Sequence, residues 1–128
     1  MLDTTFLIDA ERAGDELDEI IADDDDVAVA AITVAELLVG VAMAQGKKRA
    51  ERKTFVDALV ATLEVLPYDL DVSAAHAELL VAVRRQGLPR GAHDLIIAAT
   101  AKASGRTVVT ADTTAFDTLP DVCVQGHE

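Results

Sequence analysis

The sequence predicts an α/β fold in which a mainly parallel sheet is covered by helices on both faces. Short runs of apolar, often β-branched residues alternate along the chain with longer segments of helical periodicity, which is the order of parallel strands joined by helical crossovers. The apolar half of the chain is mainly Ala, Val, Leu and Ile, with three Phe, one Tyr and no Trp. This composition favours closely packed layers over an aromatic-rich β-barrel.

With 128 residues, the chain is long enough to bury a core, and we expect one domain over residues 1–128. The single cysteine, Cys123, excludes an internal disulfide and a multi-cysteine zinc site, which fits a reducing cytoplasm. Because Cys123 lies between two valines, we expect it in the core. Neither a signal peptide nor a membrane span is predicted, since the longest low-charge run, residues 27–45, contains Glu36 and Gly40.

The net charge of −12 comes with more Asp than Glu and with only four lysines among the 11 basic residues. Such a composition is typical of halophilic proteins from a high-salt cytoplasm, such as that of haloarchaea, where surface charge maintains solubility. An acidic balance argues mildly against a nucleic-acid partner. It does not exclude one, because salt at 1 M screens charges to within about 3 Å.

Short apolar segments bounded by turn residues are predicted to be strands. The run VAVAAI at residues 27–32 has the length of a buried strand and follows a four-carboxylate run at residues 23–26, which we interpret as a solvated loop. Pro67 ends a brief strand just before it, because proline cannot donate to a ladder. The predicted strands are residues 1–4, 27–32, 65–66, 107–110 and 122–124.

The intervening segments have helical spacing. Thr33 is predicted to be an N-cap, with Glu36 completing an S/T-x-x-E capping box, and Gly105 is predicted to be a C-cap. The predicted helices are residues 4–13, 15–22, 33–45, 47–63, 70–86 and 90–105. In the helix at residues 70–86, four apolar positions are expected to face inward: Ala74, Ala77, Leu80 and Val81.

Four acids stand among apolar residues near predicted strand ends. Asp3 and Asp112 directly follow short strands, while Glu36 and Asp94 lie in the first turns of predicted helices. In an open α/β sheet, ligands bind beyond the carboxyl ends of the strands. Four carboxylates gathered there would repel one another, and a hard divalent cation such as Mg²⁺ or Mn²⁺ is the natural compensation.

Three of these acids also have an ordinary structural interpretation. Glu36 can serve the capping box, Asp94 can favour the helix dipole, and Asp112 can form an Asx-turn before Thr113 and Thr114. Asp3, three residues into a buried strand, has no evident structural role. The coincidence of all four at similar edges favours a shared metal site.

The segments LDTTFLID, TVAELLVG, HDLIIAATA and TVVTADTTAF resemble, in order and spacing, the four acidic motifs of PIN domains, most closely those of VapC-type ribonuclease toxins. The resemblance covers nearly the whole chain. It implies a three-layer α/β/α fold, Mg²⁺- or Mn²⁺-dependent RNA cleavage and inhibition by an antitoxin. It also implies the metal-binding acids Asp3, Glu36, Asp94 and Asp112 and the supporting hydroxyls of Thr4 or Thr5 and of Thr110.

The chain departs from the family pattern in two places. Only two residues precede Asp3, whereas the family usually has another apolar residue or two before that acid. In the last motif, many relatives have Asn at the position of Asp112 and an acid or His just before the Phe. Here Ala115 stands before Phe116, and Asp117 follows it. Asp117 is therefore the alternative to Asp112 as the fourth ligand.

Contacts with RNA and with protein partners are also expected. An occupied metal site is locally positive, so an acidic protein can still bind a polyanion. Arg84, Arg85, Arg90 and the basic cluster at residues 47–53 are candidates for phosphate contacts, although a solvated or dipole-matching role is the commoner one. The alanine-rich apolar helices at residues 34–44 and 54–63 suggest a surface for a homodimer or for the antitoxin.

We therefore expect a cytoplasmic PIN-domain endoribonuclease, the toxin of a type II toxin–antitoxin pair. One alternative is a PIN-fold RNA-binding or interaction module without catalysis. Another is a receiver-like phosphoacceptor domain, but Asp3 has no acidic neighbour and no Lys follows Val109. The three histidines form no nucleophile–base arrangement, and His93 is expected to face away from Asp94.

Overall fold

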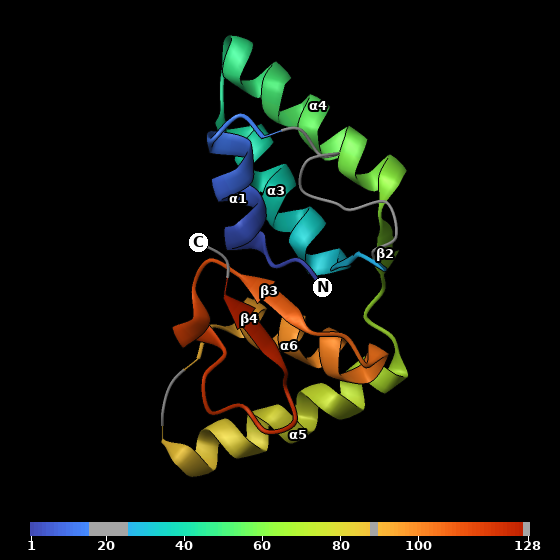
Figure 1. Cartoon of the computed structure of the whole chain (residues 1–128), viewed down its shortest axis with the longest axis vertical. Helices are drawn as coiled ribbons and strands as arrows, with labels where there is room; N and C mark the ends of the chain where they lie inside the picture. Colours follow the sequence, from blue (N-terminus) through green and yellow to red (C-terminus); the bar gives the residue numbers. More distant parts are fainter. Residues whose placement is uncertain (16–25, 88–89, 127–128) are drawn as a thin grey trace.

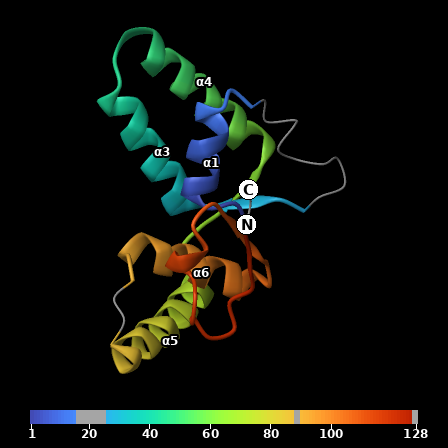
Figure 2. The same cartoon turned by 60° about the vertical axis from the view of Figure 1, so that its left-hand side comes forward.

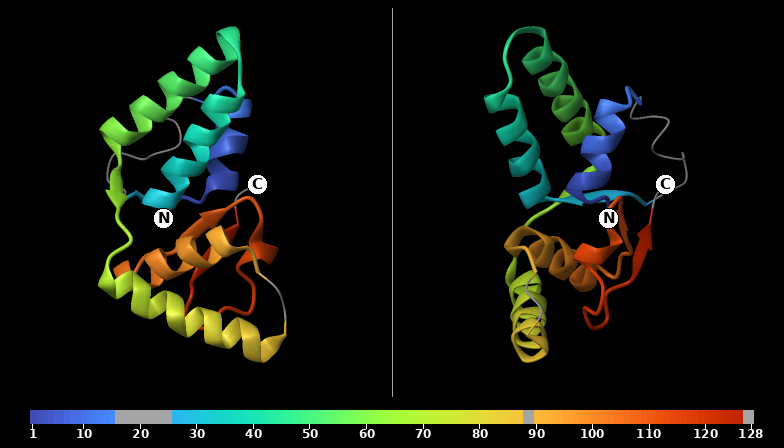
Figure 3. Two further views of the ribbon diagram at one scale, coloured as in Figure 1. Left: turned by 180° about the vertical axis from the view of Figure 1, so that it is seen from behind. Right: turned by 90° about the vertical axis from the view of Figure 1, so that its left-hand side faces the viewer.

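The computed structural model describes residues 1–15, 26–87 and 90–126. Its strands lie between two groups of helices (Figure 1). Helices α1 (Thr4–Arg12), α3 (Ala31–Met43) and α4 (Gly46–Thr62) form one group, and α5 (Leu70–Gln86) and α6 (Ala92–Ser104) form the other. Figure 2 and Figure 3 show the same separation from other directions. The predicted α/β/α fold is confirmed.

Several sequence features fall outside the residues that the structure describes. They include most of the predicted helix at residues 15–22 and residues 23–25 of the acidic run. The break at residues 88–89 and His127 are also outside the described ranges.

The strands are short and pair in parallel. β1 (Ala28–Ala30) pairs with β2 (Glu64–Leu66), and β3 (Val108–Thr110) pairs with β4 (Val124–Gly126). A single 3₁₀ turn, η1 (Thr113–Ala115), lies between β3 and β4. The last strand begins two residues later than the predicted one, and Cys123 is exposed rather than part of the core. That expectation was wrong because its neighbours Val122 and Val124 pack against the core, which turns the Cys123 side chain between them outward.

The first residues of the chain join the two strand pairs. The predicted strand at residues 1–4 is reduced to one parallel bridge between Leu2 and Val109. The Leu2 N–H donates to the Ala28 carbonyl at 3.0 Å, and the Val109 N–H donates to the Met1 carbonyl at 2.8 Å. The Asp3 N–H donates to the Val109 carbonyl at 3.0 Å. Because α1 starts at the next residue, Asp3 lies where the central segment of the sheet ends.

Neighbouring residues of the central segments face opposite layers, as the pleat of a strand requires. Met1 and Ala30 pack into the core under α5 and α6, whereas Leu2 and Val29 pack into the core under α1, α3 and α4. The sheet therefore has an apolar core on each face. This explains why its strands read as continuous apolar runs rather than as alternating ones.

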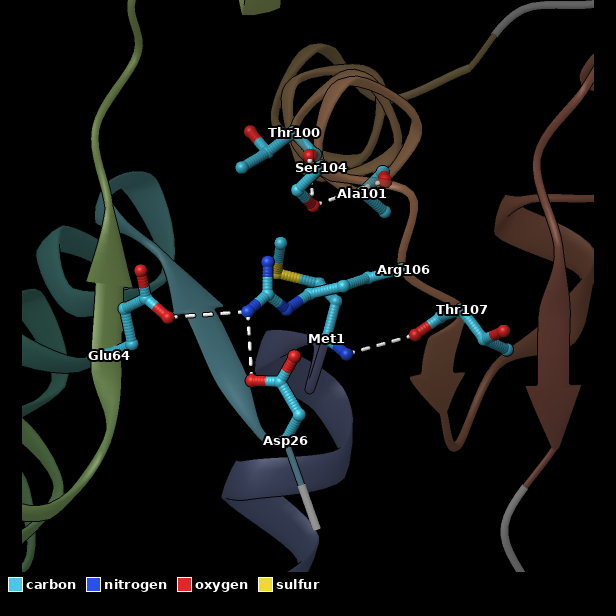
Figure 4. A network of polar contacts seen from close by, with 8 residues as sticks. All are labelled: Met1, Asp26, Glu64, Thr100, Ala101, Ser104, Arg106 and Thr107. Atoms are coloured by element: carbon cyan, nitrogen blue, oxygen red, sulfur yellow. Dashed lines mark hydrogen bonds and ion pairs between the residues drawn. The ribbon is translucent and has the colours of Figure 1, made fainter.

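At the amino-terminal end of the strands, Arg106 ties three segments together (Figure 4). Its Nη2 lies 2.9 Å from Asp26 Oδ1, just before β1, and 3.2 Å from Glu64 Oε2, the first residue of β2. The Met1 ammonium group donates to the Thr107 carbonyl at 2.9 Å beside it. These contacts anchor the edge of the sheet opposite Asp3.

The buried face of α5 differs from the predicted one. Its buried residues are Val72, Ala75 and Leu79. Ala74 and Ala77 are exposed, Val81 is 44% exposed and Leu80 is only partly buried. The prediction was wrong for Ala74, Ala77 and Val81, whereas Leu80 does pack against the core. An alanine-rich helix offers several apolar stripes, and only the position of α6 selects one of them.

No helix in the described ranges has both the length and the apolar composition that a membrane span requires.

The two faces of α5 can be told apart by truncation. Leu79 is fully buried, so Leu79→Ala should lower the free energy of unfolding by about 2–5 kcal/mol, because it removes buried methyl groups and leaves a cavity. Val81→Ala, on the exposed side of the same helix, should change the free energy of unfolding by less than about 1 kcal/mol. Urea denaturation followed by circular dichroism measures both; equal losses would contradict the observed orientation.

Candidate active site

Asp3 is almost fully buried and held by three donors. Its Oδ1 accepts the Phe6 N–H at 3.0 Å, which makes Asp3 the N-cap of α1. The Thr5 hydroxyl donates to Oδ1 at 2.9 Å, and the Thr110 hydroxyl donates to Oδ2 at 2.8 Å. Asp3 thus has a structural role that the sequence did not suggest. The donors also satisfy the oxygens of a side chain that is only 1% exposed.

Thr110 connects Asp3 to Asp112. The Asp112 N–H donates to the Thr110 hydroxyl oxygen at 3.0 Å, while the hydroxyl proton goes to Asp3. The Asp112 side chain is exposed, and its Oδ1 accepts the Thr114 hydroxyl at 2.6 Å. Asp112 therefore makes the expected local turn contact and also lies just after the end of β3.

Glu36 is presented by α3, but not through a capping box. Helix α3 begins at Ala31, directly after β1, and its N-cap residue Ala30 makes no side-chain capping bond. Thr33 is buried inside the helix, so Glu36 lies in the second turn and the predicted N-cap was wrong. The Thr4 hydroxyl lies 2.8 Å from Glu36 Oε1 and 3.2 Å from Thr33 Oγ1. Its one proton goes to the shorter, charge-assisted bond.

Asp94 lies in the first turn of α6, where the buried Leu95 and Ile97 follow it. Burial raises the pKa of the Asp94 carboxyl, and the charges of Asp3, Glu36 and Asp112 raise it further. His93 acts in the opposite direction. Three carboxylates from separate parts of the chain thus lie near enough to Asp94 to act on it electrostatically.

His93 belongs to the same region. Its Nδ1 lies 3.3 Å from Glu36 Oε2 on α3, a contact that the expected difference in helical face between His93 and Asp94 did not reveal. Helical geometry separates neighbouring side chains by about 100°, but it does not say where the partner helix lies. Here α3 approaches on the side of His93. A histidine next to one of the four acids was the available signal in the sequence.

The absence of a side chain at Gly91 leaves space for the Asp94 carboxylate. A Cβ atom at residue 91 would lie 2.9 Å from Asp94 Oδ2, which is closer than non-bonded atoms approach. The backbone of Gly91 itself is extended and open to any residue. The reason for glycine is therefore space for the carboxylate, and the sequence motif alone does not reveal it.

Asp117 does not act on Asp94, and three of the candidate phosphate-binding arginines donate to backbone carbonyls. Asp117 is not among the charges that shift the pKa of Asp94, and its carbonyl accepts from Arg90 Nη2 at 2.7 Å. In the basic cluster, Arg52 donates to the Gly40 carbonyl and Arg49 donates to the Val41 and Ala42 carbonyls. These arginines satisfy the free carbonyls at the C-terminus of α3.

The donor set fits a hard divalent cation. Asp3, Glu36, Asp94 and Asp112 offer carboxylate oxygens, which suit Mg²⁺ and Mn²⁺ better than softer metals. Within the described ranges, no three acidic, histidine or cysteine side chains are already arranged as a metal-binding group. Mg²⁺ commonly needs only one or two carboxylates and keeps several waters. Such a cation would reduce the repulsion that acts on Asp94.

Known proteins are similar to the chain over most of its length. Residues 1–121 match the family model of the PIN domain. Ribonuclease VapC5 of Mycobacterium tuberculosis is 38% identical over 113 residues, which span 88% of this chain and 82% of that protein. Toxin FitB of Neisseria gonorrhoeae is 38% identical over 110 residues, or 83% of this chain and 78% of that protein.

Solved structures agree with this assignment. VapBC2 from Rickettsia felis, bound to a DNA fragment from its promoter, superposes with a TM-score of 0.88 at 26% identity, covering 100% of this chain and 98% of that one. VapBC-5 from M. tuberculosis superposes with a TM-score of 0.79 at 32% identity, covering 98% and 96%. The chain therefore belongs to the PIN domain family and to its VapC-type ribonucleases. The receiver-like alternative was wrong.

The raised pKa of Asp94 predicts that this acid destabilises the metal-free protein. A folded-state pKa above the unfolded one means that stability is lost as the pH rises through the folded value. Asp94→Asn should therefore raise the melting temperature at pH 7 by on the order of 2 °C. The gain should vanish in acid, where Asp94 is protonated. A lower melting temperature at pH 7 would mean that the helix dipole outweighs the repulsion.

Gly91→Ala should weaken metal binding at the site while leaving the stability of the fold almost unchanged. The new methyl group meets only the end of the Asp94 side chain, so the free energy of unfolding should fall by at most about 1 kcal/mol. The displaced carboxylate should weaken Mn²⁺ binding by about tenfold in calorimetry. Gly40→Ala is the matched control, because a Cβ there meets nothing within 4 Å. Equal Mn²⁺ affinity in both variants would contradict this role of Gly91.

Proposed function

We propose that this protein is a metal-dependent endoribonuclease in which Asp3, Glu36, Asp94 and Asp112 bind Mg²⁺ or Mn²⁺. One observation carries the proposal. Three carboxylates from distant positions in the chain all act on the pKa of Asp94, in a fold shared with named VapC ribonucleases. Like charges brought together in a stable domain support a site that is completed by a cation.

The residues of the chain supply position and charge. Thr5 and Thr110 hold Asp3, and Thr4 holds Glu36, so two of the acids are oriented before any ligand arrives. A bound divalent cation would supply an acidified water as nucleophile and would neutralise charge on the phosphoryl oxygens. The carboxylates would in turn orient the cation against the scissile phosphodiester of the RNA.

Acid should weaken this site, and Asp94 should respond early. Its carboxyl has a raised pKa, so it takes up a proton before an unperturbed aspartate does as the pH falls. A protonated carboxyl is a poor ligand for a divalent cation. The supporting hydrogen bonds do not prevent this, because the threonine hydroxyls donate to Asp3 and Glu36 rather than to Asp94.

We also propose an antitoxin partner. The similar solved structures include VapBC complexes, one described as a toxin–antitoxin system. A cavity of about 130 Å³ between α1, α3 and α4 has Glu36 in its wall and Leu37, Val56 and Ile8 in its lining. On α3, Val39 and Met43 are 56% and 80% exposed. A protein segment that covers these apolar groups would also reach Glu36. The homodimer stays a prediction.

Asp94→Asn tests the proposed activity. In high salt with Mn²⁺, the purified parent should cleave single-stranded RNA, and the variant should be slower by about 100-fold or more, because it loses a charged ligand. Gel-resolved cleavage of a labelled RNA measures both rates.

Asp112→Ala and Asp117→Ala form a matched pair for the fourth position; alanine is used because Asn, which many relatives have at the position of Asp112, still offers an oxygen ligand. The first should lose activity and the second should not, because only Asp112 acts on Asp94. A parent that binds RNA but does not cleave it would support the non-catalytic module instead.

A further inference from the structure

His93 is the residue near the acids that the proposed metal set does not include. It occupies the first turn of α6, one residue before Asp94, and its side chain is 55% exposed. Its Nδ1 approaches the Oε2 atom of Glu36 on α3 to 3.3 Å. The contact therefore joins the helix that carries one acid to the helix that carries another.

Glu36 has a hydrogen-bond donor on only one of its two carboxylate oxygens. A glutamate side chain has three rotatable bonds, and this one is 29% exposed. The Thr4 hydroxyl fixes only Oε1, at 2.8 Å. The mutual repulsion of Glu36 and Asp94 would turn the remaining oxygen outward if nothing held it. Asp3, in comparison, has donors on both oxygens.

We propose that His93 is a positioning residue that holds Glu36 Oε2, so that Thr4 and His93 together fix the Glu36 carboxylate toward the other acids for cation binding. The inference rests on the proposed function, because it assigns a role at the same site. It does not depend on the charge of the ring. Nδ1–H donates in the imidazolium and in the neutral tautomer that keeps its proton on Nδ1.

Substitution of His93 by Asn or by Gln distinguishes the roles of its two ring nitrogens. In His93→Asn, the amide nitrogen takes roughly the place of Nδ1 and can still donate to Glu36. In His93→Gln, the amide nitrogen takes roughly the place of Nε2, on the side away from that contact. His93→Ala removes both. His76→Ala is the matched control, because His76 on α5 contacts the Tyr68 hydroxyl at 2.8 Å instead of an acid.

The experiment is calorimetric titration of the metal-free proteins with Mn²⁺, in parallel with RNA cleavage. His93→Ala should weaken Mn²⁺ binding by about tenfold, as removal of a partner that orients a ligand does. His93→Asn should recover most of the affinity and His93→Gln should not. The KM for RNA at saturating Mn²⁺ should stay within about twofold of the parent in all three, whereas His76→Ala should match the parent throughout.

A double-mutant cycle tests whether the effect passes through Glu36. In a Glu36→Gln background, His93→Ala should change Mn²⁺ affinity no further, because the carboxylate that it holds is gone. An undiminished effect of His93→Ala in that background would overturn the proposal. So would unchanged Mn²⁺ affinity in His93→Ala, or recovery by Gln and not by Asn together with a raised KM for RNA, which would indicate contact with RNA through Nε2.

The two proposals fail in different ways. If the parent binds Mn²⁺ and the His93 series behaves as expected, but no RNA is cleaved, the ribonuclease proposal fails and the role of His93 stands. If the parent cleaves RNA and Asp94→Asn does not, but all His93 variants bind Mn²⁺ like the parent, the ribonuclease proposal stands and the role of His93 is overturned. A parent that binds no Mn²⁺ overturns both.

Discussion

A half-buried carboxylate beside three other carboxylates is the constraint on which the candidate site is built. Asp94 faces three other acids from the edge of an apolar helix, and both burial and charge disfavour its ionised form. The surrounding structure opposes that repulsion with threonine hydroxyls that donate to Asp3 and Glu36, and an imidazole nitrogen lies beside Glu36. None of these donors serves Asp94. Asp94 is therefore where a cation would relieve the most strain.

The fold supplies the rigidity that this arrangement requires. Asp3 ends the central segment of the sheet and caps α1, so it is fixed by backbone and side-chain bonds at once. The residues behind Asp94 pack between α5 and the sheet, which leaves its helix little freedom to retreat. Gly91 then provides the space that the Asp94 carboxylate occupies. Holding like charges together without a cation should lower the free energy of unfolding, which is the usual relation between an active site and its fold.

Several of the few basic residues bind groups of the protein itself rather than forming a basic surface. Arg49 and Arg52 bond the last carbonyls of α3, and Arg106 binds Asp26 and Glu64 at the far edge of the sheet. These three arginines support the scaffold. With a net charge of −12, the chain has acidic residues in excess over its few basic ones.

Much of the scaffold could be predicted from the sequence, because helix periodicity, caps and short apolar runs are local properties of the chain. The helix at residues 70–86 has the predicted bounds, and the acids were noticeable because each stands among apolar neighbours. The contacts of these acids could not be predicted. Thr110 reaches Asp3 across 107 residues, and His93 meets Glu36 because α3 and α6 approach each other across the sheet. The sequence by itself determined which residues carry charge and which segments coil. Only the tertiary structure decided which donor meets which acid, because that depends on the order of the strands and not on any local pattern.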